Sequence, residues 1–253
     1  MPERLYTEFR SVSGVVQNDG TVATGVAGET NIVSIDGVPW EHFIIGTQTI
    51  LTPTFLAGNN DANPHLNWEQ DATATDGWVL TPYANHSRSP LAFIIGTHPA
   101  FFVELRVRVV DYSGGNPLNV GFHGSAAAAA MQAQQAVFAN YTDKATIGVT
   151  NTNDIQIVTA LNDAADVTTD TTNDAVDARI LRLRVNVSGT GVVTYRIGFN
   201  GADADAVPAL VAPTATAAFT FDNGDYVVPF IYFIQGGDVT GNLELMRFEC
   251  GYQ

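Results

Sequence analysis

The stretch FFVELRVRVVD at residues 101–111 decides the fold class, because apolar and charged residues alternate along it. The aliphatic residues fall on one side and the charged residues on the other: Val103, Leu105, Val107 and Val109 against Glu104, Arg106 and Arg108. A period of two is that of a β-strand with one face in the core. We therefore expect a strand here whose charged face points away from the core.

The same alternation returns in RILRLRVNVS at residues 179–188 and in VVTYRIGF at residues 192–199. The expected inward-facing residues are Leu181, Leu183, Val185 and Val187 in the first run, and Val193, Tyr195, Ile197 and Phe199 in the second. The short link SGTG at residues 188–191 joins them. Two alternating runs with a short glycine-containing link predict an antiparallel hairpin.

The run VVPFIYFI at residues 227–234 is apolar without alternation. A strand of this kind has both faces covered, so we expect the opposing sheet on one side and another layer or subunit on the other. Pro229 lacks the N–H that a ladder requires, which favours an edge strand or a bulge at that point.

The chain as a whole is punctuated by the hairpin-type dipeptides Asp-Gly and Asn-Gly, which predict an all-β, antiparallel β-sandwich. A cluster of turn residues at 58–64 suggests a division into residues 1–60, a β-rich N-terminal arm or small anchoring domain, and residues 61–253, the sandwich. One short surface helix is expected at Ser125–Phe138, with Ser125 as N-cap of an alanine run. The aspartate-rich residues 161–177 are expected to form an exposed loop.

The charge balance limits the function classes. The 253 residues include 11 Lys and Arg against 26 Asp and Glu, a net charge of −15, which argues against binding to nucleic acid or an anionic membrane. Neither an apolar run long enough to span a bilayer nor a secretory signal is seen, so we expect a soluble protein that stays in the compartment where it is made. A low share of charged residues, 15%, suggests that apolar surface meets protein partners.

Catalytic motifs are missing from the sequence. The five histidines lack zinc-ligand spacing, no Gly-x-Ser-x-Gly elbow or phosphate-binding glycine loop occurs, and the single cysteine, Cys250, is expected to be a small buried strand residue. We therefore expect no enzyme, no cofactor and no catalytic or metal-binding residue. A glycoside hydrolase using Glu104 and Glu244 stays open as an alternative, against ordinary cross-strand ion pairing with arginine.

Two further alternatives concern ligands. Oxygen-rich loops bind calcium, and the aspartates of the acidic stretch are candidates, although a solvated loop is favoured: Asp163, Asp166, Asp170, Asp174 and Asp177. Aromatic residues can stack on sugars, although packing in the core or at an interface is favoured: Trp40, Trp68, Trp78, Tyr83 and Tyr112.

The arginines provide the candidate interface. On the expected strands they fall on faces away from the core, in a protein that is acidic elsewhere: Arg106, Arg108, Arg182, Arg184 and Arg196. Arginine is favoured at protein interfaces because its planar fork binds carboxylates. We predict that this face docks onto an acidic partner or a sister subunit, with intrachain ion pairs as the alternative. The doubly covered run adds Val228, Phe230 and Tyr232 to the candidate contacts.

Several motifs carry a resemblance to a known group of proteins. They are HSRSP at 86–90, FIIGTHPAFF at 93–102, VGF at 120–122, AFTFDNGDYVVPFIYF at 218–233 and FECGY at 248–252. With these motifs the chain resembles virion structural proteins of tailed bacteriophages, most closely those of podovirus-type phages of aquatic bacteria, over about residues 65–253. The resemblance implies a concanavalin-like or jelly-roll sandwich displayed on the phage particle, with no catalytic residues to transfer.

The resemblance also implies a role and a location. We expect a capsid decoration or cement protein on the surface of the virion, made in the host cytoplasm, that binds the major capsid protein or other virion proteins and forms a homo-oligomer. The alternative is a tail or fibre component that binds host glycan, and a polysaccharide depolymerase is the third reading.

Overall fold

The computed structural model describes residues 5–7, 12–16, 30–35, 38–46, 54–55, 66–69, 75–82, 92–109, 112, 118–125, 137–235 and 242–253. The regular elements in these ranges are β-strands and one short 3-10 turn, η1 (Phe138–Asn140), joined by turns and irregular connections, and all of the strand pairings are antiparallel. The predicted all-β sandwich is confirmed. No helix in the part described is long and apolar enough to cross a membrane. The predicted surface helix falls mainly on residues 126–136, outside the described ranges.

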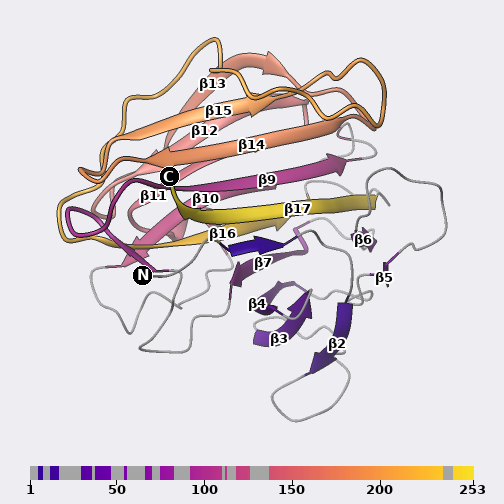
Figure 1. Ribbon diagram of the computed structural model, residues 1–253, viewed down its shortest axis with the longest axis horizontal. Helices are drawn as coiled ribbons and strands as arrows, with labels where there is room; N and C mark the ends of the chain where they lie inside the picture. The colour runs from indigo at the N-terminus through magenta and orange to yellow at the C-terminus, as the bar shows by residue number, and fades with distance from the viewer. Residues whose placement is uncertain are drawn as a thin grey trace.

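Sheet A forms one layer, with the order β15-β14-β9-β17-β6-β5 and β1 also paired with β17 (Figure 1). Its strands are β1 (Leu5–Thr7), β5 (Thr54–Phe55), β6 (Leu66–Glu69), β9 (Phe101–Val109), β14 (Ile180–Val187), β15 (Val193–Gly198) and β17 (Asn242–Tyr252). The alternating stretches of the sequence are therefore β9, β14 and β15. The predicted hairpin is confirmed, with Val187 opposite Val193 across the turn.

Sheet B forms the second layer, with the order β13-β12-β11-β10-β16-β7-β4-β3-β2 and β8 also paired with β16 (Figure 1). Its strands are β2 (Val12–Val16), β3 (Thr30–Ile35), β4 (Val38–Ile45), β7 (Gly77–Pro82), β8 (Phe93–Ile94), β10 (Leu118–Ser125), β11 (Lys144–Val149), β12 (Asp154–Ala160), β13 (Val167–Asp174) and β16 (Tyr226–Ile234).

The acidic stretch 161–177 corrects one expectation, because its centre is strand β13 and not a loop. β13 pairs with β12 and carries four threonines among exposed polar residues. Thr171 is fully buried and donates to the carbonyl of Ile155 at 2.6 Å. β-Branched threonines favour extended backbone, and an edge strand tolerates a polar face. The aspartates therefore belong to a strand and its flanking turns.

Pro229 corrects a second expectation, because β16 lies inside sheet B and not at its edge. Pro229 stands opposite Phe122 of β10 in a regular register. On the other side of β16, β8 pairs with residues 226–227 and β7 with residues 231–234, so neither of these two strands pairs with Pro229. The missing N–H thus falls at a break between two short neighbours, where no ladder bond to them is needed.

The predicted arm, residues 1–60, contributes strands to both sheets. β2, β3 and β4 extend sheet B beyond β7, and the ring of Trp40 packs edge-on against Phe248 of sheet A with 4.8 Å between centroids. The predicted boundary at 58–64 lies outside the described residues, so the division into two domains stays a prediction.

The core lies between the inner faces of the two sheets. The predicted inward-facing residues of β9 and β14 are all buried, as is Cys250. Rings from both layers stack there: Phe93 lies 4.2 Å from Phe101, and Phe122 packs edge-on against Phe101 at 5.1 Å. Each buried side chain of this size contributes roughly 1.5–3 kcal/mol.

A second apolar cluster covers the outer face of sheet B. It contains Ile45, Val79, Tyr141, Phe230 and Tyr232, with Phe43, Phe138 and Ile234 packed against it. The predicted double coverage of β16 is confirmed, and residues of the same chain form the covering layer. Val228, Phe230 and Tyr232 are buried within the single chain, with 2%, 0% and 1% of their surface exposed.

The connection from β15 to β16 closes one side of the sandwich. Val211 exchanges two backbone hydrogen bonds with Ile197 of β15, at 2.9 and 2.7 Å. Further along, the N–H of Ala215 donates to the carbonyl of Thr171 in β13 at 3.0 Å. One segment therefore covers part of both sheet edges, which removes hydrogen-bonding groups that invite edge-to-edge aggregation.

Two buried histidines give a test of the fold. Burial lowers the pKa of His42 and of His123 from 6.5 to about 3. The unfolded chain takes up these protons near pH 6.5, whereas the folded chain does so only near pH 3. The contribution of these two histidines to the free energy of unfolding is therefore fully present above pH 6.5 and is lost as the pH falls toward 3. We expect the free energy of unfolding to fall by about 1.4 kcal/mol per pH unit for each histidine.

Urea unfolding between about pH 6.5 and 5 measures this slope. The variant His123→Phe keeps a ring between Tyr141 and Phe230, whose centroids each lie 4.7 Å from His123. In this variant one proton fewer is taken up on unfolding, so the slope of the free energy of unfolding against pH should be smaller. A slope equal to that of the unaltered protein would contradict the burial of His123.

Candidate functional site

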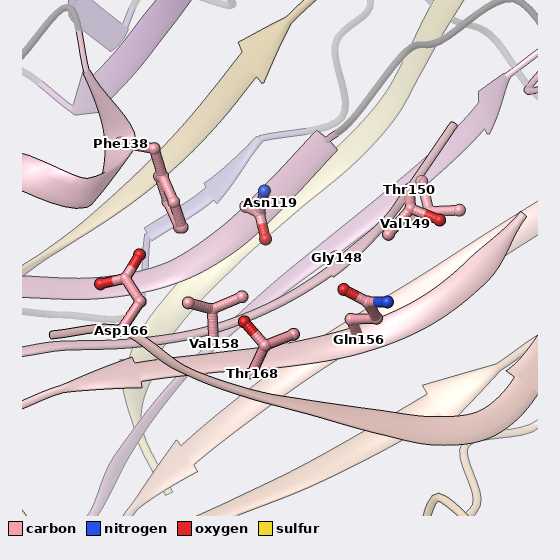
Figure 2. A pocket seen from close by; sticks show the side chains of 9 residues that line it. All are labelled: Asn119, Phe138, Gly148, Val149, Thr150, Gln156, Val158, Asp166 and Thr168. Carbon is pink, nitrogen blue, oxygen red and sulfur yellow. The ribbon is translucent and has the colours of Figure 1, made fainter. Parts of the chain in front are cut away.

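A pocket of about 220 Å³ opens on the outer face of sheet B, over β10 to β13 (Figure 2). Its lining residues come from four strands, η1, the turn between β11 and β12, and the connection before β13: Asn119, Phe138, Gly148, Val149, Thr150, Gln156, Val158, Asp166 and Thr168. The volume is below the ~300–1,000 Å³ of pockets that enclose drug-sized molecules. It therefore suits a ligand of about one ring.

Cross-strand register builds the floor. Asn119, Gly148 and Gln156 stand opposite one another across β10, β11 and β12, and Val158 stands opposite Thr168 in the next row. Strand alternation directs the neighbouring Ile147 and Ile157 into the core, so these polar residues point outward. A Cβ at Gly148 would lie 2.2 Å from the backbone oxygen of Leu118 and 2.4 Å from Oδ1 of Asn119, so the neighbouring strand leaves room only for glycine here.

The polar groups on this floor are not used within the part of the chain that the structure describes. The side-chain amides of Asn119 and Gln156 have no hydrogen-bond partner there, and each offers two donors and an acceptor. Figure 2 shows both amides along the floor and the ring of Phe138 standing over one end. The pocket thus combines one aromatic ring with free amides.

One end of the pocket is fixed by a buried cation. Asp166 forms an ion pair with Lys144, with 2.6 Å between Oδ1 and Nζ. The same Nζ donates to the carbonyl of Phe138 at 2.7 Å and lies 4.4 Å from the centroid of its ring. Burial lowers the pKa of Lys144, and the hydrogen bond and charge of Asp166 act in the opposite direction.

The predicted arginine face exists, on the outer side of sheet A. Alternation places Arg106, Arg108, Arg182, Arg184 and Arg196 there together, and β17 adds Arg247. Arg247 was not predicted from the sequence, because a register shift next to it interrupts the alternation of β17. The predicted apolar contacts of β16 lie on the opposite face of the molecule, so structure divides the candidate interface into two separate sets.

Ion pairs hold most of these arginines. Glu104 is only 3% exposed and accepts from Arg182 at 2.7 and 3.0 Å and from Arg184 at 3.3 Å. Arg108 pairs with Glu244 and with Asp205. Arg196 is exposed and has no ion pair within the described ranges. Glu104 and Glu244, the two carboxylates considered for glycoside hydrolysis, are thus both held in the cross-strand pairs that were the alternative.

The aspartates of the acidic stretch do not gather. Among the residues that the structure describes, no three carboxylate, imidazole or thiol groups come together as a metal site. Asn162 instead links Asp143 and Asp222 by hydrogen bonds. Its backbone N–H donates to the carboxylate of Asp143 at 2.6 Å, and its side-chain amide donates to the carboxylate of Asp222 at 2.8 Å. Burial raises the pKa of Asp225 nearby, with smaller contributions from the charges of Asp143 and Asp222.

The aromatic residues considered for sugar stacking have separate outcomes. Trp40, Trp78 and Tyr112 are fully buried in the core, as the favoured interpretation expected. Tyr83 and the side chain of Trp68 lie outside the described residues. The aromatic residue of the pocket, Phe138, was not singled out from the sequence because only the fold brings η1 over the floor.

Comparison with solved structures identifies the type of sandwich. The exoplasmic/lumenal domain of VIP36 in its Ca²⁺-bound form gives a TM-score of 0.52 at 10% identity, covering 99% of this chain and 90% of that chain. Its Ca²⁺/Man2-bound form gives 0.52 at 11% identity, with 99% and 87% covered. A protein of unknown function from Shewanella oneidensis MR-1 gives 0.45 at 10% identity, with 83% and 77% covered.

At these identities the VIP36 likeness shows the fold alone, a concanavalin-like, legume-lectin-like β-sandwich. No protein-family model and no curated protein sequence matches the chain.

The carboxylate group around Asn162 yields a prediction for Asp225. The pKa of Asp225 is raised mainly by burial, so the folded protein holds its proton more readily than the unfolded chain does. Burial of the charged carboxylate, with a smaller contribution from repulsion by Asp143 and Asp222, therefore destabilises the fold above that pKa, and this cost is relieved as the pH falls through it. Asp225→Asn keeps an oxygen for the N–H of Asp222, 2.8 Å away. We expect it to raise the free energy of unfolding at pH 7 by a fraction of about 1 kcal/mol.

The comparison is made by urea unfolding at pH 7 and at about pH 3. Exposed Asp203→Asn, which keeps its local turn, serves as the control. A variant that is less stable at pH 7 would contradict the prediction, since the favourable contacts of the Asp225 carboxylate would then outweigh the cost of its burial and of the repulsion.

Proposed function

We propose that this chain is a non-enzymatic, lectin-like β-sandwich that binds a neutral carbohydrate in the pocket on the outer face of sheet B. One observation carries the proposal: the amides of Asn119 and Gln156 and the hydroxyl of Thr168 face the same small pocket as the ring of Phe138. A sugar ring has matching chemistry, with hydroxyls at its rim and an apolar C–H face that packs on an aromatic ring.

The character of the pocket supports a polar ligand of modest size. Small-molecule sites use a few convergent polar groups to fix orientation, and here those groups are amides and hydroxyls that both donate and accept. A sugar hydroxyl does the same. Shape also agrees, since a pocket of about 220 Å³ open to solvent holds one residue of a longer glycan and lets the rest extend outward.

The comparisons support the same class of ligand. VIP36 was solved with bound Man2 and with bound Man3GlcNAc, the latter at a TM-score of 0.51 and 10% identity to this chain. Sandwiches of this architecture therefore carry carbohydrate sites, and the pocket supplies a place for one here. The resemblance to phage virion proteins supports a setting for it, a tail or fibre component that holds host glycan.

A glycan array followed by calorimetry tests the proposal. We expect binding to a defined set of neutral glycans, and we expect Asn119→Ala and Gln156→Ala each to weaken it by about 1–1.5 kcal/mol, roughly five- to tenfold, through loss of hydrogen bonds. The control is Thr194→Ala, an exposed residue of β15 on sheet A. An array without a binder, or equal affinity in all variants, would refute the site.

A second candidate function is capsid decoration through the arginine face of sheet A, and Arg196 favours it. It is exposed on the outer face of β15, the face that also carries the half-exposed Val192 four residues earlier, whereas Arg182 and Arg184 are committed to Glu104. Exposed arginine beside apolar surface is the composition of interface centres.

Arg196→Glu tests this second function without disturbing a buried ion pair. We expect it to lower binding to isolated phage heads at least about tenfold, because the glutamate places a negative charge opposite an acidic partner. Arg196→Lys keeps the positive charge and should bind almost as well as the unaltered protein. Co-sedimentation with heads measures the bound fraction. Equal co-sedimentation of both variants would count against decoration, and so would a particle that carries only a few copies.

A further inference from the structure

Lys144 is the only lysine of the chain, and its side chain is completely buried. Removing a charge from water costs several kcal/mol unless partners compensate it. The first stabilising partner is the carboxylate of Asp166, and the second is the carbonyl of Phe138. The ring of Phe138, 4.4 Å from Nζ, is the third. The ammonium group therefore uses its donors within the protein.

The two residues that provide these partners, Asp166 and Phe138, both line the pocket and come from different segments. Phe138 belongs to η1, whereas Asp166 precedes β13. Figure 2 shows them at the same end of the pocket, one above the other. Lys144 lies in β11, below both, and ties them to the sheet. The width of this end of the pocket thus depends on one side chain that does not line it.

The charge of the pocket depends on the same contact. Asp166 is the only ionisable residue among those that line the pocket. Its Oδ1 is taken by Lys144, and with 24% of its side chain exposed the group still reaches the solvent side. The pair sums to zero charge. A ligand therefore meets an acceptor oxygen without a net negative potential.

We infer that Lys144 sets the ligand selectivity of the pocket: by neutralising Asp166 and holding Phe138, it makes the site fit an uncharged sugar and not an amino sugar or a uronic acid. This inference rests on the carbohydrate-binding function proposed above. Lys144 acts through Asp166 and Phe138, so it is a positioning residue and makes no contact with the ligand.

Three matched sugars test the inference: the neutral hexose selected by the glycan array, its 2-amino-2-deoxy analogue and its uronic acid. The experiment is calorimetry at about pH 6, where the amine is protonated and the carboxylate ionised. The unaltered protein should prefer the neutral sugar. The variants differ in pocket charge: Lys144→Met leaves −1, Asp166→Asn leaves +1, and the double variant Lys144→Met/Asp166→Asn restores zero.

We expect Lys144→Met to shift the affinity ratio toward the amino sugar by about fivefold, the size expected of a partly exposed charge pair. Asp166→Asn should shift the ratio toward the uronic acid by a similar factor. The double variant should return to the neutral sugar with weaker affinity, since Phe138 is no longer held. Lys144→Arg keeps the charge and should keep the ratio.

Folding is checked by thermal unfolding of each variant. If Lys144→Met does not fold, Asp166→Asn still changes the pocket charge, to +1, and the double variant, whose pocket charge is zero, serves as its matched control. Identical ratios in every variant that binds sugar would overturn the inference and leave the proposed function standing. Failure of the unaltered protein to bind any of the three sugars would overturn both.

Discussion

Sheet B buries apolar side chains on both of its faces, and the other parts of the molecule are arranged to satisfy that demand. The inner face is covered by sheet A. The side chains of Phe230 and Tyr232 lie on the outer face of β16, so a second layer is required to bury them. Phe138 of η1 and Tyr141, directly after η1, belong to that layer. Toward β12 and β13 the outer face becomes polar and the cover ends. The pocket lies on this border, with an aromatic wall from the cover and a polar floor from the strands.

Lys144 stands on the same border, which explains why a fully buried lysine is tolerated. On its side of β11 it meets the underside of η1, where a carbonyl and an aromatic ring are available, and the chain before β13 brings a carboxylate. Breaking a buried pair by removing one partner is strongly unfavourable, so the three groups constrain one another. The interactions that compensate the buried charge are therefore the ones that shape the pocket.

The outer face of sheet A is covered by charged side chains, in contrast to that of sheet B. Instead of a second apolar layer, rows of arginine and glutamate cover the strands, and Glu104 is buried beneath two arginines. Arg184 also packs over the ring of Phe102, 3.8 Å from its centroid, so its stem and its charge both contribute. These pairs explain how positive charge gathers on one face of an acidic protein. They also show that most of the arginines form ion pairs within the chain, so a partner would have to compete with these pairs.

The alternation of the sequence was sufficient to predict β9, β14 and β15, because each strand has one face in the core and one in an ion-paired layer. The same reasoning predicted double coverage for β16. It failed for β13, whose sequence VTTDTTND contains threonine, aspartate and asparagine without an apolar face. An edge strand of this kind is stabilised by pairing with β12 and by a single buried threonine. Its polar composition alone predicts a loop.

The pocket was beyond sequence reasoning for a related reason. Asn119, Gly148 and Gln156 are separated by up to 37 residues in the chain, and only the registers of β10, β11 and β12 place them in one row. A slip of one residue in β12 would turn Gln156 into the core and set Ile157 on the floor. The burial of Ile155 and Ile157 prevents that slip. The apolar core thus fixes the polar site from below, and the chemistry of the pocket is decided by residues that never reach it.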